Sequence, residues 1–163
     1  MKPAIYLDYM STTPAYESVI QAMLNCLGSC GTYGNPGSGS HTYGIAAHQT
    51  IKKARLQVAH AVGASARDII WTSGATESNN LAILGAARFY KSSGKHIISV
   101  QTEHKSVLKP LEFLQEEGFS ITLLPVDLHG RVSLDDVKKA IRTDTILIAV
   151  MHINNETGVI QDI

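Results

Sequence analysis

The feature that most constrains the fold is an alternation of two hydrophobic patterns that begins near residue 69. Short apolar runs with strand character alternate with longer segments in which apolar residues recur at helical spacing. The predicted strands are residues 69–72, 96–100, 121–126 and 145–150. The predicted helices between them are residues 79–90, 107–118 and 133–141. This alternation predicts an α/β fold in which helices cover a mostly parallel sheet.

Two more helices are predicted ahead of this alternation. They are residues 19–27 and 45–62. A glycine suited to a C-terminal cap follows each of them. The segment 31–44 between them is rich in Gly, Ser, Asn and Pro, which predicts a loop. We therefore expect an N-terminal arm, helix and Gly-rich loop over residues 1–44, followed by a larger domain over residues 45–163.

Composition and charge exclude several classes of protein. The 163 residues carry a formal net charge of zero, so no electrostatic footprint favours nucleic acid or an anionic membrane surface. No apolar run approaches the length that spans a membrane, and residues 1–9 lack the extended apolar segment of a signal peptide. We expect a cytoplasmic protein with no direct nucleic-acid or membrane role.

The cysteines and histidines give little support for a metal site. Cys26 and Cys30 lie four residues apart in a helix-like segment, a spacing that could place both thiols on one face. No further cysteine or organised histidine cluster accompanies them, so we expect ordinary thiols, with a redox or metal pair as the alternative. Because the histidines lack zinc-site spacing, we predict no metal.

The segment Trp71–Asn80 is the first candidate for chemistry, because a predicted strand there runs through small residues into a helix. Backbone N–H groups in the first turn of a helix lack internal partners and lie at the positive end of its dipole, so this turn suits a phosphate. Thr76 adds a hydroxyl, and Ala75 leaves the approach open. The alternative is that Ser73 and Thr76 merely cap the helix, with Glu77 tuning its dipole.

Three polar clusters each follow a predicted strand. They are Ser73–Thr76, Thr102–His104 and His152–Glu156. Ligands of parallel sheets bind beyond the carboxyl ends of the strands, so we expect the clusters to converge there. His104 is either a helix-start residue without chemistry or an imidazole that stacks on a ring or moves protons, oriented by Glu103. Asn154 and Asn155 either cap a turn or hold a ligand hydroxyl.

Five blocks of sequence together resemble the ordered signature of the cysteine desulfurases, a group of pyridoxal-phosphate enzymes with an aminotransferase-like fold. The blocks are Tyr6–Tyr9 with Thr12–Pro14, Gly34–Ser38, Thr72–Asn80, Thr102–His104 and Asn154–Gly158. They span the chain, and two of them, Tyr6–Tyr9 and the run Ser73–Ser78, favour the housekeeping iron–sulfur branch of the group over the stress-dedicated branch. The resemblance implies part of the large domain of the type I pyridoxal-phosphate fold.

The resemblance also implies a function. The family takes sulfur from L-cysteine with pyridoxal 5′-phosphate as cofactor, and it yields alanine and an enzyme persulfide for iron–sulfur cluster assembly. Ala75 and Thr76 match phosphate-binding positions. His104 matches the imidazole that stacks over the pyridine ring and transfers protons, so it is the expected catalytic residue and a cofactor contact. Asn155 matches a cofactor-binding residue near the ring hydroxyl. A second copy of the chain in a homodimer and an iron–sulfur scaffold or other sulfur acceptor are the expected partners.

The chain departs from the family pattern in length, since it is less than half as long as the family's members. It lacks the carboxylate that pairs with the pyridine nitrogen, the cofactor-binding lysine and the persulfide cysteine. Lys105 belongs to the earlier Thr-Glu-His block, and neither Cys26 nor Cys30 matches a catalytic position. We therefore expect the isolated segment to be inactive. Two alternatives stay open, which are a related aminotransferase or lyase of the same fold and a non-catalytic interaction module.

Overall fold

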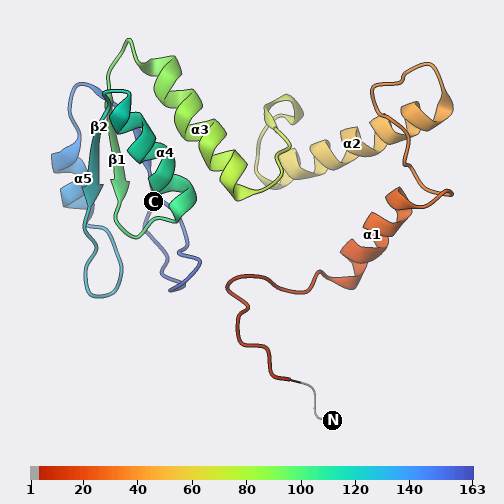
Figure 1. Cartoon of the computed structure of the whole chain (residues 1–163), viewed down its shortest axis with the longest axis horizontal. Helices are drawn as coiled ribbons and strands as arrows, with labels where there is room; N and C mark the ends of the chain where they lie inside the picture. The colour runs from red at the N-terminus through yellow and green to blue at the C-terminus, as the bar shows by residue number, and fades with distance from the viewer. Residues whose placement is uncertain (1–3) are drawn as a thin grey trace. The chain divides into compact units, whose positions relative to one another are not determined.

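The structure is a computed structural model that describes residues 4–163 (Figure 1). The first three residues, where the predicted N-terminal arm begins, lie outside the described part. The chain consists of two compact units, Met1–Trp71 and Thr72–Ile163. The division predicted after residue 44 stays a prediction. Among the described residues, no helix is both long enough and apolar enough to cross a membrane.

The described residues of the first unit form two α-helices and a short 3-10 helix. They are α1 (Glu17–Leu27), α2 (Thr42–Ala61) and η1 (Ala66–Asp68). The helix α1 ends before Gly28, as predicted, and none of its residues is buried. The helix α2 begins earlier than predicted, because Nδ1 of His41 accepts the N–H of Gly44 at 3.1 Å and caps it. It ends before Gly63, whose φ of +66° suits glycine.

The second unit is a three-stranded parallel sheet with helices packed against it. Its elements are α3 (Ala75–Tyr90), β1 (His96–Val100), α4 (Lys105–Glu116), β2 (Ser120–Leu124), α5 (Leu134–Ala140) and β3 (Thr145–Ala149). The strand order is β2-β1-β3 and both pairs are parallel, so β1 is the central strand. The predicted α/β class with a parallel sheet is confirmed.

The central strand β1 is also the centre of the core, because all five of its residues are buried. Helices α3 and α4 pack against each other and against this strand through one apolar cluster. The buried members of the cluster are Ile83, Ala87, Ile97, Val107, Leu111, Leu114 and Phe119. This packing fixes the first turns of the two helices relative to the edge of the sheet at which the strands end.

One predicted strand is wrong. Residues 69–72 pair with no strand in the described part of the chain. The carbonyl of Ile69 instead accepts a hydrogen bond from the guanidinium of Arg55. Its apolar run gives a local preference for extended backbone, but a strand also needs a neighbour with which to form a ladder. The other predicted strands differ from the observed ones by two residues or fewer at either end.

A buried histidine joins the three strands at their amino ends. His96, the first residue of β1, is fully buried. Its Nδ1 lies 2.7 Å from Oγ1 of Thr145 on β3, and its Nε2 lies 2.8 Å from Oγ1 of Thr122 on β2. Burial lowers the pKa of His96, and nearby Arg142 lowers it further while Asp144 opposes the change. A neutral imidazole therefore bridges the sheet.

Candidate functional site

The polar loops that follow β1 and β3 lie against each other, as expected for neighbouring parallel strands. Two hydrogen bonds join them. The carboxylate of Glu103 accepts the N–H of Met151 at 2.6 Å, and Nδ2 of Asn154 donates to the carbonyl of Thr102 at 3.0 Å. Because residues of both loops take part in these bonds, the geometry of one loop depends on that of the other.

The first turn of α3 presents free amides. The helix begins at Ala75, and the preceding Gly74 supplies no side-chain cap. Within the described residues, the N–H groups of Ala75, Thr76 and Glu77 have no hydrogen-bond acceptor. Ala75 and Thr76 are exposed, so a ligand can approach them. Free N–H groups at the positive end of a helix dipole favour an anion.

The capping alternative for this turn is only partly correct. A capping residue would accept an N–H group of the helix with its side chain, and the side chain of Ser73 does not. It donates its N–H and its hydroxyl to the carboxylate of Glu77, both at 2.6 Å. These two bonds, with the hydroxyl as the main cause, lower the pKa of Glu77. Glu77 therefore places a negative charge at the helix start, as the alternative predicted, while no cap comes from the side chain of Thr76 within the described residues.

His104 is the N-cap residue of α4. Its Nδ1 accepts the main-chain N–H of Ser106 at 3.1 Å, and the hydroxyl of Ser106 lies 2.8 Å from the same nitrogen. The ring is exposed, and Nε2 has no hydrogen bond to any described residue. Glu103, which was predicted to orient the ring, instead binds the main chain of Met151. The helix-start role of His104 thus leaves one ring nitrogen free for chemistry.

Glu103 itself is a buried acid, with 7% of its surface exposed. Burial raises its pKa, and the N–H of Met151 only partly offsets this effect. The carboxyl therefore holds its proton more firmly than an exposed glutamate does. Acids of this kind next to a histidine are typical of functional sites, although buried structural networks produce the same shift.

The two neighbouring asparagines have different roles. Asn154 is buried, and its Oδ1 accepts the N–H groups of Glu156 and Thr157, both at 2.9 Å. Its side chain thus closes the turn, as one of the two alternatives predicted. Asn155 is exposed, and its side chain makes no hydrogen bond to a described residue. The amide of Asn155 is therefore free to bind a ligand.

Two cavities open beside these loops. One, of about 280 Å³, is lined by both His104 and Asn155. The other, of about 440 Å³, is lined by His104 and by Asn79 of α3. Ala75 and Thr76 line neither cavity, but they begin the same helix, one turn before Asn79. The structure therefore brings His104 and Asn155 together, whereas Ala75 and Thr76 lie outside both cavities, at the start of the helix that carries Asn79.

Asn79 and Ser106 are site residues that the sequence reasoning missed. Nδ2 of Asn79 donates to Oγ of Ser106 at 2.8 Å, and Ser106 in turn contacts His104. The position of Ser106, two residues after a histidine at a helix start, was a local signal for the second contact. The contact with Asn79 crosses 27 residues of sequence and had no such signal.

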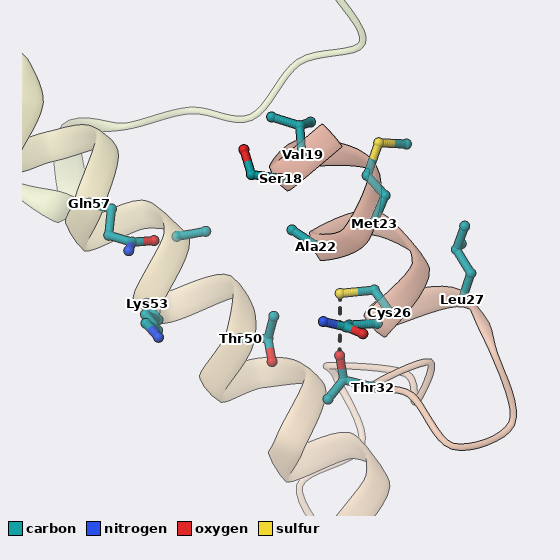
Figure 2. A pocket seen from close by; sticks show the side chains of 12 residues that line it. Ser18, Val19, Ala22, Met23, Cys26, Leu27, Thr32, Thr50, Lys53 and Gln57 are labelled. Atoms are coloured by element: carbon teal, nitrogen blue, oxygen red, sulfur yellow. Dashed lines mark hydrogen bonds between the residues drawn. The ribbon is translucent and has the colours of Figure 1, made fainter. Parts of the chain in front are cut away.

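A larger cavity, of about 760 Å³, lies in the first unit between α1 and α2 (Figure 2). Its lining is mostly apolar and includes Met23, Cys26 and Leu27, and the hydroxyl of Thr32 contacts Sγ of Cys26 at 3.5 Å. It contains none of the predicted site residues. Cys26 is half-buried and Cys30 is exposed. No cluster of histidine, cysteine and acidic side chains suited to a metal occurs among the described residues.

Comparisons with known proteins give matches over nearly the whole chain. The family model for class V aminotransferases matches residues 5–163. The cysteine desulfurase IscS of Actinobacillus succinogenes is 53% identical over all 163 residues, which is 40% of its own length. The IscS of Photorhabdus laumondii is 52% identical with the same coverage. The chain thus spans about 40% of the length of the curated relatives that it matches.

Solved structures show the same fold. A NifS-like protein superposes with a TM-score of 0.88 at 36% identity, covering 94% of this chain and 41% of that one. SspA in complex with cysteine superposes with a TM-score of 0.88 at 38% identity, covering 96% of this chain and 44% of that one.

Proposed function

The chain belongs to the class V aminotransferase family, and from this membership we propose that it forms part of a pyridoxal-phosphate-dependent cysteine desulfurase. The family uses pyridoxal phosphate in general. The proposed overall reaction takes sulfur from L-cysteine, leaves alanine and passes the sulfur to a cysteine thiol of the enzyme as a persulfide. Iron–sulfur scaffolds and other sulfur-acceptor proteins are the proposed recipients, and a homodimer is the proposed assembly.

The observation that carries the proposal is the shared cavity of His104 and Asn155 at the carboxyl edge of a parallel sheet. An exposed imidazole and a free amide there fit an aromatic ring that carries a hydroxyl. The free amides and the hydroxyl of Thr76 at the start of α3 fit a phosphate. The residues present thus match the donor pattern of pyridoxal phosphate at both of its ends.

Each residue has a distinct proposed task. Ala75 and Thr76 bind the phosphate through their main-chain N–H groups, and the hydroxyl of Thr76 donates a further hydrogen bond. His104 packs its ring on the cofactor and moves a proton at Nε2, the nitrogen that α4 leaves free. Asn155 donates its amide to the ring hydroxyl. When bound, pyridoxal phosphate supplies the electron sink, which no side chain provides.

A titration of the chain with pyridoxal phosphate and with pyridoxal tests the phosphate assignment. We expect the phosphorylated compound to bind at least about tenfold more tightly, since charge-assisted hydrogen bonds contribute about 1.5–3 kcal/mol. Thr76→Val should remove much of this preference. The matched control is Ser133→Ala, which deletes a hydroxyl that caps α5. Equal affinity for the two compounds would refute the assignment.

The reaction is tested on the whole enzyme of which this chain is proposed to form part, with L-cysteine as substrate and an excess of a thiol that reduces the persulfide to sulfide and is itself oxidised to a disulfide. A desulfurase forms alanine and sulfide in equal amounts without a 2-oxo acid. An aminotransferase of the same fold requires a 2-oxo acid and releases no sulfide. A separate experiment tests the expectation that Lys105 is not the cofactor-binding lysine. The chain is reduced with borohydride after addition of pyridoxal phosphate, and covalent trapping of the cofactor on Lys105 would contradict that expectation.

A further inference from the structure

A chain of three polar side chains links the first turns of α3 and α4. Nδ2 of Asn79 on α3 lies 2.8 Å from Oγ of Ser106 on α4, and this Oγ lies 2.8 Å from Nδ1 of His104. Ser106 is 6% exposed, and Asn79 is half-buried. Two polar groups from different helices are thus withdrawn from water beside one exposed imidazole.

The direction of these hydrogen bonds follows from the groups that take part. The main-chain N–H of Ser106 can only donate, so Nδ1 of His104 is an acceptor. The amide nitrogen of Asn79 also can only donate, so it occupies a lone pair of the Ser106 hydroxyl. The proton of that hydroxyl is then free to point at Nδ1. Two donors therefore face Nδ1, and the proton of the neutral ring belongs on Nε2.

We infer that Asn79 and Ser106 are positioning residues that hold the imidazole of His104 in the Nε2–H form with a fixed ring orientation. The inference rests on the proposed function, because it concerns the nitrogen that is proposed to move a proton. It adds two residues, neither of which is proposed to touch the cofactor or the substrate.

Capping of α4 does not by itself explain this arrangement. The N–H of Ser106 alone satisfies the cap, and a buried serine hydroxyl and an asparagine from another helix add nothing to it. These two side chains instead contact His104, through the hydroxyl of Ser106, and join α3 to α4, through the bond from Asn79. Asn79 lies one turn after Thr76 on α3, so its hydrogen bond to Ser106 links the proposed proton-moving group at the start of α4 to the helix that begins at the proposed anion site.

The first test measures the tautomer of His104 in the chain without cofactor. With histidine labelled by ¹⁵N, the two ring nitrogens are assigned by NMR at a pH where the ring is neutral. We expect Nε2–H to predominate. Ser106→Ala should lower the ratio of Nε2–H to Nδ1–H about fivefold, the equivalent of one hydrogen bond of about 1 kcal/mol. Ser106→Thr, which keeps the hydroxyl, should restore the ratio.

Asn79→Asp is a second variant that keeps the shape of the side chain. A carboxylate can only accept, so the hydroxyl of Ser106 turns toward it and no longer donates to His104. We expect a fall in the tautomer ratio at least as large as that of Ser106→Ala. Ser133→Ala, the matched control on α5, should leave the ratio unchanged. A ratio within twofold of the parent protein in both Ser106→Ala and Asn79→Asp would overturn the inference.

The second test uses L-cysteine and the whole enzyme of which this chain is proposed to form part. Ser106→Ala should lower kcat for alanine formation about tenfold while KM stays within about twofold, because the hydroxyl affects the proton-moving ring and not substrate binding. A parallel rise in KM with unchanged kcat would overturn the positioning role. A whole enzyme that forms no alanine contradicts the proposed function, whereas the tautomer ratios still decide whether Asn79 and Ser106 hold the ring.

Discussion

Replacement of His96 by phenylalanine isolates the contribution of the buried bridge across the sheet. Phenylalanine keeps an aromatic ring of similar size but removes both ring nitrogens, and with them the bonds to Thr122 and Thr145. Each bond contributes about 0.5–1.5 kcal/mol. Both threonines are half-buried, and the hydroxyl of Thr145 keeps the N–H of Arg142 at 2.8 Å. We therefore expect a cost of about 2 kcal/mol, near the middle of the summed range.

Urea unfolding followed by circular dichroism measures this cost, and its pH dependence identifies the cause. Burial lowers the pKa of His96 below the value of 6.5 that the unfolded chain has. As the pH falls through about 6.5, the unfolded chain binds a proton that the folded chain does not, so the parent protein loses stability. The variant lacks this loss. The difference between the two proteins should therefore be largest above about pH 7 and should shrink below about pH 6.

A double variant provides the control. Adding Thr122→Val to His96→Phe removes a hydroxyl that the phenylalanine leaves without its partner, so it should recover part of the loss. The reasoning is refuted if His96→Phe costs less than about 0.5 kcal/mol, or if its cost is the same at every pH.

Three further outcomes are expected. Glu103→Gln keeps an oxygen that accepts the N–H of Met151 and removes the ionisation that burial opposes. Because burial raises the pKa of Glu103, the free energy of unfolding of the parent protein falls as the pH rises above about 4.5, so the variant should become more stable relative to the parent between about pH 4.5 and about pH 7. An equal pH dependence of unfolding in the two proteins would contradict this. Asn154→Ala loses two acceptor bonds and one donor bond, so hydrogen exchange at the amide of Thr157 should accelerate at least about tenfold while exchange in β1 is unchanged. Leu114→Ala empties a fully buried site between α4 and the sheet and should cost about 2–5 kcal/mol in urea unfolding; a cost below about 1 kcal/mol would show that the core around it is loosely packed.

The elements that the sequence predicted best are those fixed by local signals. The bounds of β1 were predicted correctly, because its apolar run is short and well delimited in the sequence. All five of its residues are buried, as a central strand of a parallel sheet requires. The start of α5 was predicted from Ser133, whose hydroxyl does accept the N–H of Asp136 at 3.3 Å. The extended segment 69–72 was assigned as a strand because propensity is local, whereas pairing depends on a neighbour that the pattern does not identify.

The candidate site divides in the same way. The sequence identified that the loops after β1 and β3 would meet, since the carboxyl ends of neighbouring parallel strands share one edge. The third expected cluster, Ser73–Thr76, follows no strand of the described residues and lines neither of the two cavities. It did not identify which side chain would bind which group. Glu103 was assigned to its neighbour His104, but it binds the main chain of Met151, 48 residues away. The bond between Asn79 and Ser106 spans 27 residues and depends on the packing of α3 against α4.

Asn154 and Asn155, the two asparagines after β3, should differ in their tolerance of mutation although they are identical neighbours. The side chain at position 154 must both accept and donate hydrogen bonds at the length of an asparagine side chain. Aspartate has no donor there, and the side chain of glutamine is too long. The side chain of Asn155 is exposed and makes no hydrogen bond to a described residue, so the fold does not depend on it. A library of all substitutions, sorted once for soluble expression and once for growth that depends on the protein, should therefore deplete variants of residue 154 in both screens and variants of residue 155 in the second alone.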